Sequence, residues 1–176
     1  MEARKTVPGE RVWVQRMEEL DLVGKFDLIC SLSWTVHYCG GPHELEDVLS
    51  RIWRALSPEG TILLQVAHGP NLEPGWREDT ETGPGGRVGD ITLRYRFQPS
   101  GEDGSSTLAE YQYRCESEHE YFSESHLLKV TNVHQIERLC TLAGFENVEL
   151  WNSWRKEPFG DSGSAWVVAR KSRGPR

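Results

Sequence analysis

Two almost continuously apolar segments with an amphipathic segment between them constrain the fold most strongly. The first runs from Phe26 to Leu32 and the second from Thr61 to Ala67. Runs of this kind are typical of strands buried on both faces of a parallel sheet. Between them, apolar residues recur every three or four positions and predict a helix. Its stripe comprises Leu45, Val48, Leu49, Ile52, Trp53 and Leu56. The segment therefore predicts a strand–helix–strand unit with a right-handed crossover.

The middle of the chain has a different pattern. Residues 69–90 are rich in Gly, Pro and acidic residues and predict an irregular excursion. Apolar and polar residues then alternate over Ile91–Phe97 and Ala109–Cys115, which predicts half-buried antiparallel strands. A third strand is expected between Glu118 and Val130. Residues 69–131 therefore predict an antiparallel insert of three strands.

The C-terminal part returns to mixed helix and strand patterning. Asn132 suits the N-cap of a helix, and Gly144 suits the left-handed residue after its end. Strands are expected at Phe145–Trp151 and Ala165–Arg170. A short β-rich segment, Arg11–Gln15, precedes all of these elements.

Composition and charge exclude several classes of protein. The 20 Lys and Arg against 27 Asp and Glu give a net charge of -7, which argues against a nucleic-acid binder. No run of about 18 apolar residues predicts a membrane span, and the N-terminus does not resemble a secretory signal. The four cysteines lack zinc-site and C-x-x-C spacing. We expect a cytoplasmic protein without a metal site, acting neither on nucleic acid nor at a membrane.

Three motifs stand in the order found in class I S-adenosylmethionine-dependent methyltransferases. Phe26–Ile29 resembles the family's fourth-strand motif, and Leu56–Leu64 resembles its leucine–x–proline–glycine–glycine motif with the following apolar strand. Leu142–Phe145 resembles the end of its last helix. The insert is similar to the cover of N-methyltransferases that act on glycine and amino sugars. The resemblance implies one Rossmann-like α/β domain over residues 1–176, in which residues 69–131 cover the substrate.

Two parts of the family pattern are missing from this sequence. It contains no G-x-G-x-G turn and no acidic residue after a second strand. We therefore expect an incomplete sheet that lacks the N-terminal, cofactor-binding third of the family domain. Phe26–Leu32 would then have an open edge, and such edges pair with other chains. We expect self-association there, unless Arg11–Gln15 shifts to fill the gap or the chain folds poorly.

The resemblance also implies which residues bind S-adenosylmethionine. At the family's adenine-binding position Met17 keeps the packing group, whereas Arg16 replaces the usual acid. The remaining candidates follow the carboxyl end of Phe26–Leu32, where α/β sheets place ligands. They are Ser31, Leu32, Ser33 and Trp34, the last as a packing partner for adenine. Because the glycine-rich turn is missing, we expect a dissociation constant of about 1 mM or weaker.

The catalytic candidates are His126, Tyr38 and His37. His126 falls where some of these N-methyltransferases place a histidine, and a neutral imidazole can accept a proton near pH 7. Tyr38 and His37 lie on the loop after Phe26–Leu32. The resemblance implies methyl transfer to a small substrate, most simply an amine. The alternatives are a structural role for these residues and a non-catalytic fragment that acts as a binding module.

Overall fold

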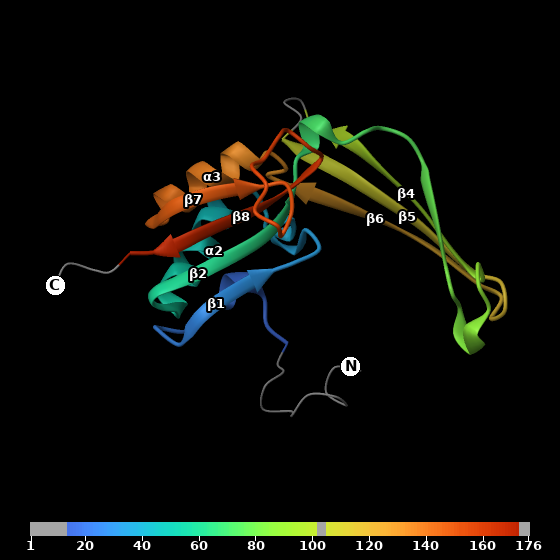
Figure 1. Cartoon of the computed structure of the whole chain (residues 1–176), viewed down its shortest axis with the longest axis horizontal. Helices are drawn as coiled ribbons and strands as arrows, with labels where there is room; N and C mark the ends of the chain where they lie inside the picture. The colour runs from blue at the N-terminus through green and yellow to red at the C-terminus, as the bar shows by residue number, and fades with distance from the viewer. Residues whose placement is uncertain (1–13, 102–104, 173–176) are drawn as a thin grey trace.

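Two four-stranded sheets form the body of the molecule (Figure 1). The computed structural model describes residues 14–101 and 105–172. The first sheet has the strand order β1-β2-β8-β7, and the second has the order β3-β4-β5-β6. The second sheet is a long arm that extends away from the first (Figure 1). We call the second sheet the cover.

The first sheet confirms the predicted strand–helix–strand unit. Its strands are β1 (Phe26–Ser31), β2 (Leu56–Ala67), β7 (Phe145–Trp151) and β8 (Ser164–Lys171). β1 runs parallel to β2, whereas β8 is antiparallel to both β2 and β7. Helices α2 (Pro42–Ala55) and α3 (Val133–Leu142) contact each other and bury their apolar stripes in one core with β2 and β8.

The predicted burial of the first strand on both faces is wrong for the described residues. The side chain of Leu28 is 55% exposed, and Cys30 is also exposed. Ile29, by contrast, packs against the core. Within residues 14–101 and 105–172, β1 pairs with β2 alone, so it is an edge strand. β1 therefore has an open edge among the described residues, as predicted. Self-association through this edge stays a prediction.

The start of β2 also differs from the prediction. The helix ends at Ala55, and the strand begins at Leu56, five residues before Thr61. Leu56 pairs with Phe26, but the next pair is Thr61 with Leu28, so extra residues bulge out of β2. Glu59 has a φ of 67° within this bulge. The bulge lets the chain leave α2 and enter the ladder directly.

The cover contains the three predicted strands and one that the sequence pattern missed. They are β4 (Ile91–Ser100), β5 (Ser106–Cys115) and β6 (Glu120–Lys129), joined by β3 (Arg77–Glu81). All five residues of β3 are exposed and polar, so they show no apolar alternation. β3 pairs only along one side of β4, which requires backbone hydrogen bonds but no buried face.

Both ends of α3 match the sequence signals. The Oδ1 atom of Asn132 accepts hydrogen bonds from the backbone N–H groups of His134 and Gln135, at 3.0 and 3.4 Å. Gly144 has a φ of 96°, which favours glycine because it has no Cβ. The cap formed by Asn132 lies where the chain leaves the cover and enters the core.

The predicted short strand near the N-terminus lies partly outside the described residues. Arg11–Gln15 is described only from Val14 onward, and neither Val14 nor Gln15 belongs to a strand. Over the described ranges, no helix combines the length and hydropathy that a membrane crossing requires. The same ranges contain no group of three or more His, Cys, Asp or Glu side chains that could hold a metal ion.

Candidate functional site

A cavity of about 370 Å³ lies at the carboxyl end of β1. Four of the predicted cofactor-binding residues line it: Arg16, Met17, Ser31 and Leu32. Leu20 and the apolar side of α2 complete its walls. The volume falls in the range of small-molecule sites, and most of the lining is apolar. The structure therefore brings these four residues together around one hollow.

Polar groups at this cavity differ in how well they are paired. The guanidinium of Arg16 lies 3.3 Å from the carboxylate of Glu18, whose hydrogen bond raises the pKa of Arg16. The Oγ atom of Ser31 is buried and has no hydrogen-bond partner among the described residues. A buried hydroxyl without a partner is costly, so it favours a ligand that bonds to it. Ser31 is therefore the polar group best placed to receive a ligand here.

The other two predicted cofactor-binding residues turn away from the cavity. Ser33 and Trp34 have φ values of 52° and 61°, so the chain turns sharply after β1. The backbone N–H of Ser33 donates to Oε1 of Gln65 at 2.9 Å. The ring of Trp34 meets Phe97 of β4 edge to face, with centroids 4.9 Å apart. Trp34 thus packs against the cover, and this geometry does not support it as a packing partner for adenine.

His37 connects the two sheets and is fully buried. Its Nε2 atom accepts from the backbone N–H of Ala67 at 2.8 Å, and Nδ1 lies 3.0 Å from the carbonyl oxygen of Lys129. Burial lowers its pKa to about 4, so the ring is neutral at pH 7. Both ring nitrogens are occupied by backbone groups. This geometry does not support proton removal from a substrate by His37, and the residue braces the fold.

Tyr38 and His126 lie side by side, although 88 positions separate them in the sequence. Their ring centroids are 5.5 Å apart in an edge-to-face arrangement, and Tyr111 lies 5.8 Å from His126. Nε2 of His126 is 3.4 Å from Oε1 of Glu124. We call Tyr38, Tyr111, Glu124 and His126 the ring cluster. It joins the loop after β1 to the face of the cover that carries Phe97.

The two tyrosines of the ring cluster are hydrogen-bond donors at neutral pH. Burial, and then the negative charge of Glu124, raise the pKa of Tyr38 above its usual value of 10.0. Burial raises the pKa of Tyr111 in the same direction, with smaller effects from Tyr38 and Glu124. A phenol of raised pKa does not remove protons at pH 7. The raised pKa values of the two tyrosines leave the imidazole of His126 as the candidate proton acceptor of the ring cluster.

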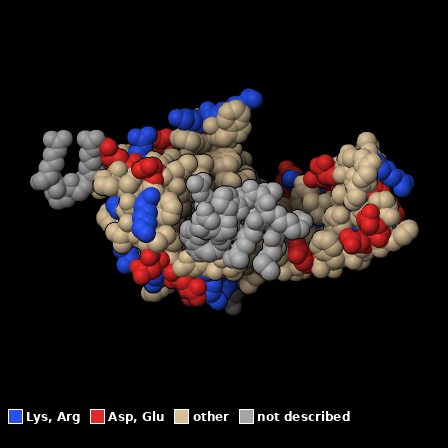
Figure 2. All heavy atoms as spheres, turned by 90° about the horizontal axis from the view of Figure 1, so that it is seen from below, with Lys and Arg blue, Asp and Glu red and all other residues tan. Residues whose placement is uncertain are grey.

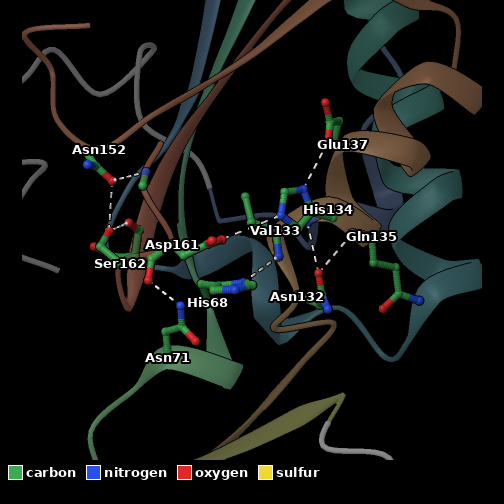
Figure 3. Close-up of polar contacts among 12 residues, drawn as sticks. His68, Asn71, Asn132, Val133, His134, Gln135, Glu137, Asn152, Asp161 and Ser162 are labelled. Atoms are coloured by element: carbon green, nitrogen blue, oxygen red, sulfur yellow. Dashed lines mark hydrogen bonds and ion pairs between the residues drawn. The ribbon is translucent and has the colours of Figure 1, made fainter. Parts of the chain in front are cut away.

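A second polar network lies at the same edge of the first sheet (Figure 3). The backbone N–H of Val133 donates to Nδ1 of His68 at 3.3 Å, and the ring of His68 meets that of His134. Nδ1 of His134 lies 3.3 Å from Glu137, and the side chain of Asn71 donates to the backbone oxygen of Asp161. This network connects the end of β2 and the start of α3 to the turn before β8.

Charge is distributed without a dominant sign on the face seen in Figure 2. Lys and Arg side chains alternate with Asp and Glu over both the first sheet and the cover. The ring cluster has one carboxylate of its own, that of Glu124.

No protein-family model and no curated protein sequence matches this chain. Solved structures do match it. A methyltransferase from Clostridium acetobutylicum, described as S-adenosylmethionine-dependent, has a TM-score of 0.74 and 12% identity, over 98% of this chain and 70% of its own. CalS10 from Micromonospora echinaspora, an amino pentose methyltransferase solved with S-adenosylmethionine, has a TM-score of 0.72 and 21% identity, over 97% and 68%.

DesVI from Streptomyces venezuelae is similar to the same degree. Its TM-score is 0.72 at 19% identity, over 97% of this chain and 69% of its own. These similarities confirm the predicted fold class. The chain has the α/β fold of class I methyltransferases, with an antiparallel sheet inserted after the second strand of the unit.

Sequence reasoning missed Glu124 and did not single out Tyr111 from the other tyrosines of the insert. Glu124 stands two residues before His126 on β6, and alternate residues of a strand share a face. Tyr111 pairs with Glu124 in the ladder between β5 and β6. Alternation along the insert could therefore have identified Glu124, but the selection of Tyr111 requires the register.

Proposed function

We propose that the protein transfers a methyl group from S-adenosylmethionine to the nitrogen of a small amine. The observation that carries this proposal is the position of the ring cluster. Tyr111, Glu124 and His126 lie on the cover itself, and Tyr38 comes from the loop after β1, which begins at the cavity of Arg16, Met17, Ser31 and Leu32. This loop connects the cavity proposed for the donor to the cluster proposed for the acceptor. The similar structures include enzymes described as sugar and amino pentose methyltransferases, which supports this assignment.

The residues of the cavity fit the nucleoside part of the proposed cofactor. Met17, Leu20 and Ile52 offer apolar surface to a flat base, and the unpartnered Oγ of Ser31 offers a hydrogen bond. S-adenosylmethionine, when bound, supplies an electrophilic methyl group and leaves as S-adenosylhomocysteine. The sequence contains no G-x-G-x-G turn, so we propose that binding by this chain is weak, with a dissociation constant of about 1 mM or above.

On the acceptor side, the chain must deliver a neutral amine in the correct orientation. Methyl transfer requires a nitrogen lone pair, so an ammonium group must first lose a proton. We propose that His126 takes that proton and that Tyr38 and Tyr111, whose rings contact that of His126, orient the acceptor. Most of the rate enhancement in such a reaction comes from holding the reacting atoms in line.

A methyl-transfer assay tests the proposal. The purified protein is incubated with S-adenosylmethionine carrying a labelled methyl group at millimolar concentration, together with a panel of primary amines that includes amino sugars. Mass spectrometry then measures labelled products. We expect labelled N-methyl product with the native protein and a large loss with His126→Ala. Absence of labelled product across the panel, from protein with a cooperative thermal unfolding transition, would contradict the proposal.

A further inference from the structure

The ring cluster contains a carboxylate that methyl transfer itself does not require. Glu124 lies on β6, and its side chain is 52% exposed. In the ladder it stands opposite Tyr111, which in turn stands opposite Tyr95. Its charge raises the pKa of both Tyr38 and Tyr111, so the carboxylate acts on both phenol groups. A negative charge beside the rings of Tyr38, Tyr111 and His126 attracts a cation.

The other charge in this cross-strand row does not cancel that of Glu124. Arg77 pairs with Tyr95 at the far side of the cover, and its guanidinium lies 2.6 Å from the carboxylate of Glu73. The ion pair described for Glu124 is with His126, which is charged only after it takes a proton. Before proton transfer, Glu124 therefore presents a negative charge to whatever enters beside the rings.

We propose that Glu124 and the rings of Tyr38 and Tyr111 form a subsite for an organic ammonium ion. This inference rests on the proposed function, because it identifies which form of the acceptor the site selects. The carboxylate attracts the ammonium group directly, and the faces of electron-rich rings add a cation–π attraction. The chemical class of ligand is a small molecule with a protonated amine next to an apolar body.

The same carboxylate also suits the proton transfer that must follow. The bound ammonium group gives its proton to the imidazole of His126, which leaves a neutral amine and an imidazolium ion. Total charge is unchanged by this step, and the new positive charge lies next to Glu124, whose Oε1 atom is 3.4 Å from Nε2. Glu124 is therefore placed to hold the cation before the proton moves and after it.

Binding of two matched probes, measured without S-adenosylmethionine, tests the subsite. Cyclohexylamine is a cation at pH 7, and cyclohexanol is a neutral molecule of nearly the same shape. NMR titrations follow the ring resonances of Tyr38 and His126. We expect the native protein to bind the amine about fivefold more tightly than the alcohol, since an exposed charge pair contributes up to about 1 kcal/mol. Added salt should reduce this preference.

The variants Glu124→Gln and Glu120→Gln assign the preference to one carboxylate. Both remove a single charge from the same face of β6, but Glu120 stands opposite Cys115, away from the ring cluster. We expect Glu124→Gln to abolish the preference and Glu120→Gln to retain it, with equal melting temperatures. A preference that survives in Glu124→Gln, or a native protein that shows no preference or no shift of these rings, would overturn the inference.

The outcomes separate this inference from the proposed function. The binding measurement requires no methyl transfer, so an inactive protein could still show the ammonium preference. Conversely, methylated product without any preference for the cationic probe would leave methyl transfer standing and remove the role of Glu124.

Discussion

The two sheets bury their side chains in opposite ways. The first sheet and its helices share a core of aliphatic residues, several with no exposed surface, such as Leu49, Ile62 and Val167. The cover has only three buried members in its own described cluster, Phe97, Ala109 and Leu128. On the same face Thr107 and Cys115 are also buried, whereas Tyr111 is partly buried and Glu124 is exposed. The first sheet therefore holds most of the buried aliphatic core, whereas several aromatic rings of the cover are partly exposed.

Two histidines show the same contrast on a smaller scale. His37 is fully buried with both nitrogens bonded to backbone groups, and it connects the first sheet to the cover. His126 is partly exposed and touches two tyrosine rings. Both histidines are close to the loop after β1, but the ring nitrogens of His37 are occupied by backbone groups, whereas His126 is the residue that we propose as proton acceptor.

The largest expected effect is the loss of activity on replacing His126. Replacing His126 by Ala should lower the rate of methyl transfer by about 10²–10⁴-fold, the usual range for loss of an acid–base group. The melting temperature should change little, because His126 completes no core. The matched control is His43→Ala, an exposed histidine at the start of α2. A loss below about threefold for His126→Ala, or an equal loss in the control, would contradict the assignment.

The second prediction separates the sheets by stability. Leu49→Ala should lower the free energy of unfolding by about 2–5 kcal/mol, since it leaves a cavity in a fully buried site. Phe122→Ala in the cover should cost about 1 kcal/mol or less, because that ring is 50% exposed and mainly stacks on Tyr113. Urea unfolding measures both. Equal losses would show that the cover contributes to the stable core.

The third prediction concerns how the free energy of unfolding depends on pH through His37, which connects the two sheets. The pKa of His37 is about 4 in the folded protein against an ordinary 6.5, so the unfolded state binds more protons between these values. Stability should therefore be full above about pH 6.5 and fall as the pH drops toward 4, by up to about 3 kcal/mol. Burial lowers the pKa of His68 also, which adds a loss of the same sign.

Unfolding curves between pH 7 and 4 for His37→Gln measure the share of this one residue. We expect a flatter dependence on pH than in the native protein, and lower stability at pH 7, because the N–H of Ala67 loses its acceptor. His43→Gln should keep the native slope. If His37→Gln has the native slope as well, another group causes the acid sensitivity.

The smallest expected effect concerns the joint between the cover and α3. Asn132→Ala should cost about 1 kcal/mol, since two backbone N–H groups lose their side-chain acceptor. Asn132→Asp keeps an acceptor oxygen and should recover most of this loss. Thermal unfolding measures the difference. Identical melting temperatures for all three proteins would show that the cap contributes nothing to stability.

The parts of the fold predicted from sequence are those where burial leaves a pattern. The stripe of α2 and the alternation in β4 and β5 both record which face meets a core. β3 was not predicted from the sequence because its five residues are exposed and polar. The burial of β1 was overestimated because an apolar sequence shows what a strand can pack against, not whether a neighbour is present.

Position along the chain predicted part of the lining of the cavity, but a role of these residues in cofactor binding stays a prediction. Ser31 reaches the cavity as the last residue of β1, whereas Met17 reaches it from a 3-10 turn that follows no described strand. Trp34 and His37 lie away from the cavity, because two left-handed residues turn the chain toward the cover. The sequence does not predict this turn, since neither Ser33 nor Trp34 is a glycine. Glu124 required the strand register as well as the alternation.

A crystal structure of the protein with S-adenosylhomocysteine at high concentration tests the central claim most directly. We expect the adenosine part in the cavity, between Met17 and the Oγ of Ser31, with the sulfur atom facing the ring cluster of Tyr38, Tyr111, Glu124 and His126. Electron density for the nucleoside at any other place, or a sulfur atom facing away from His126, would contradict the account.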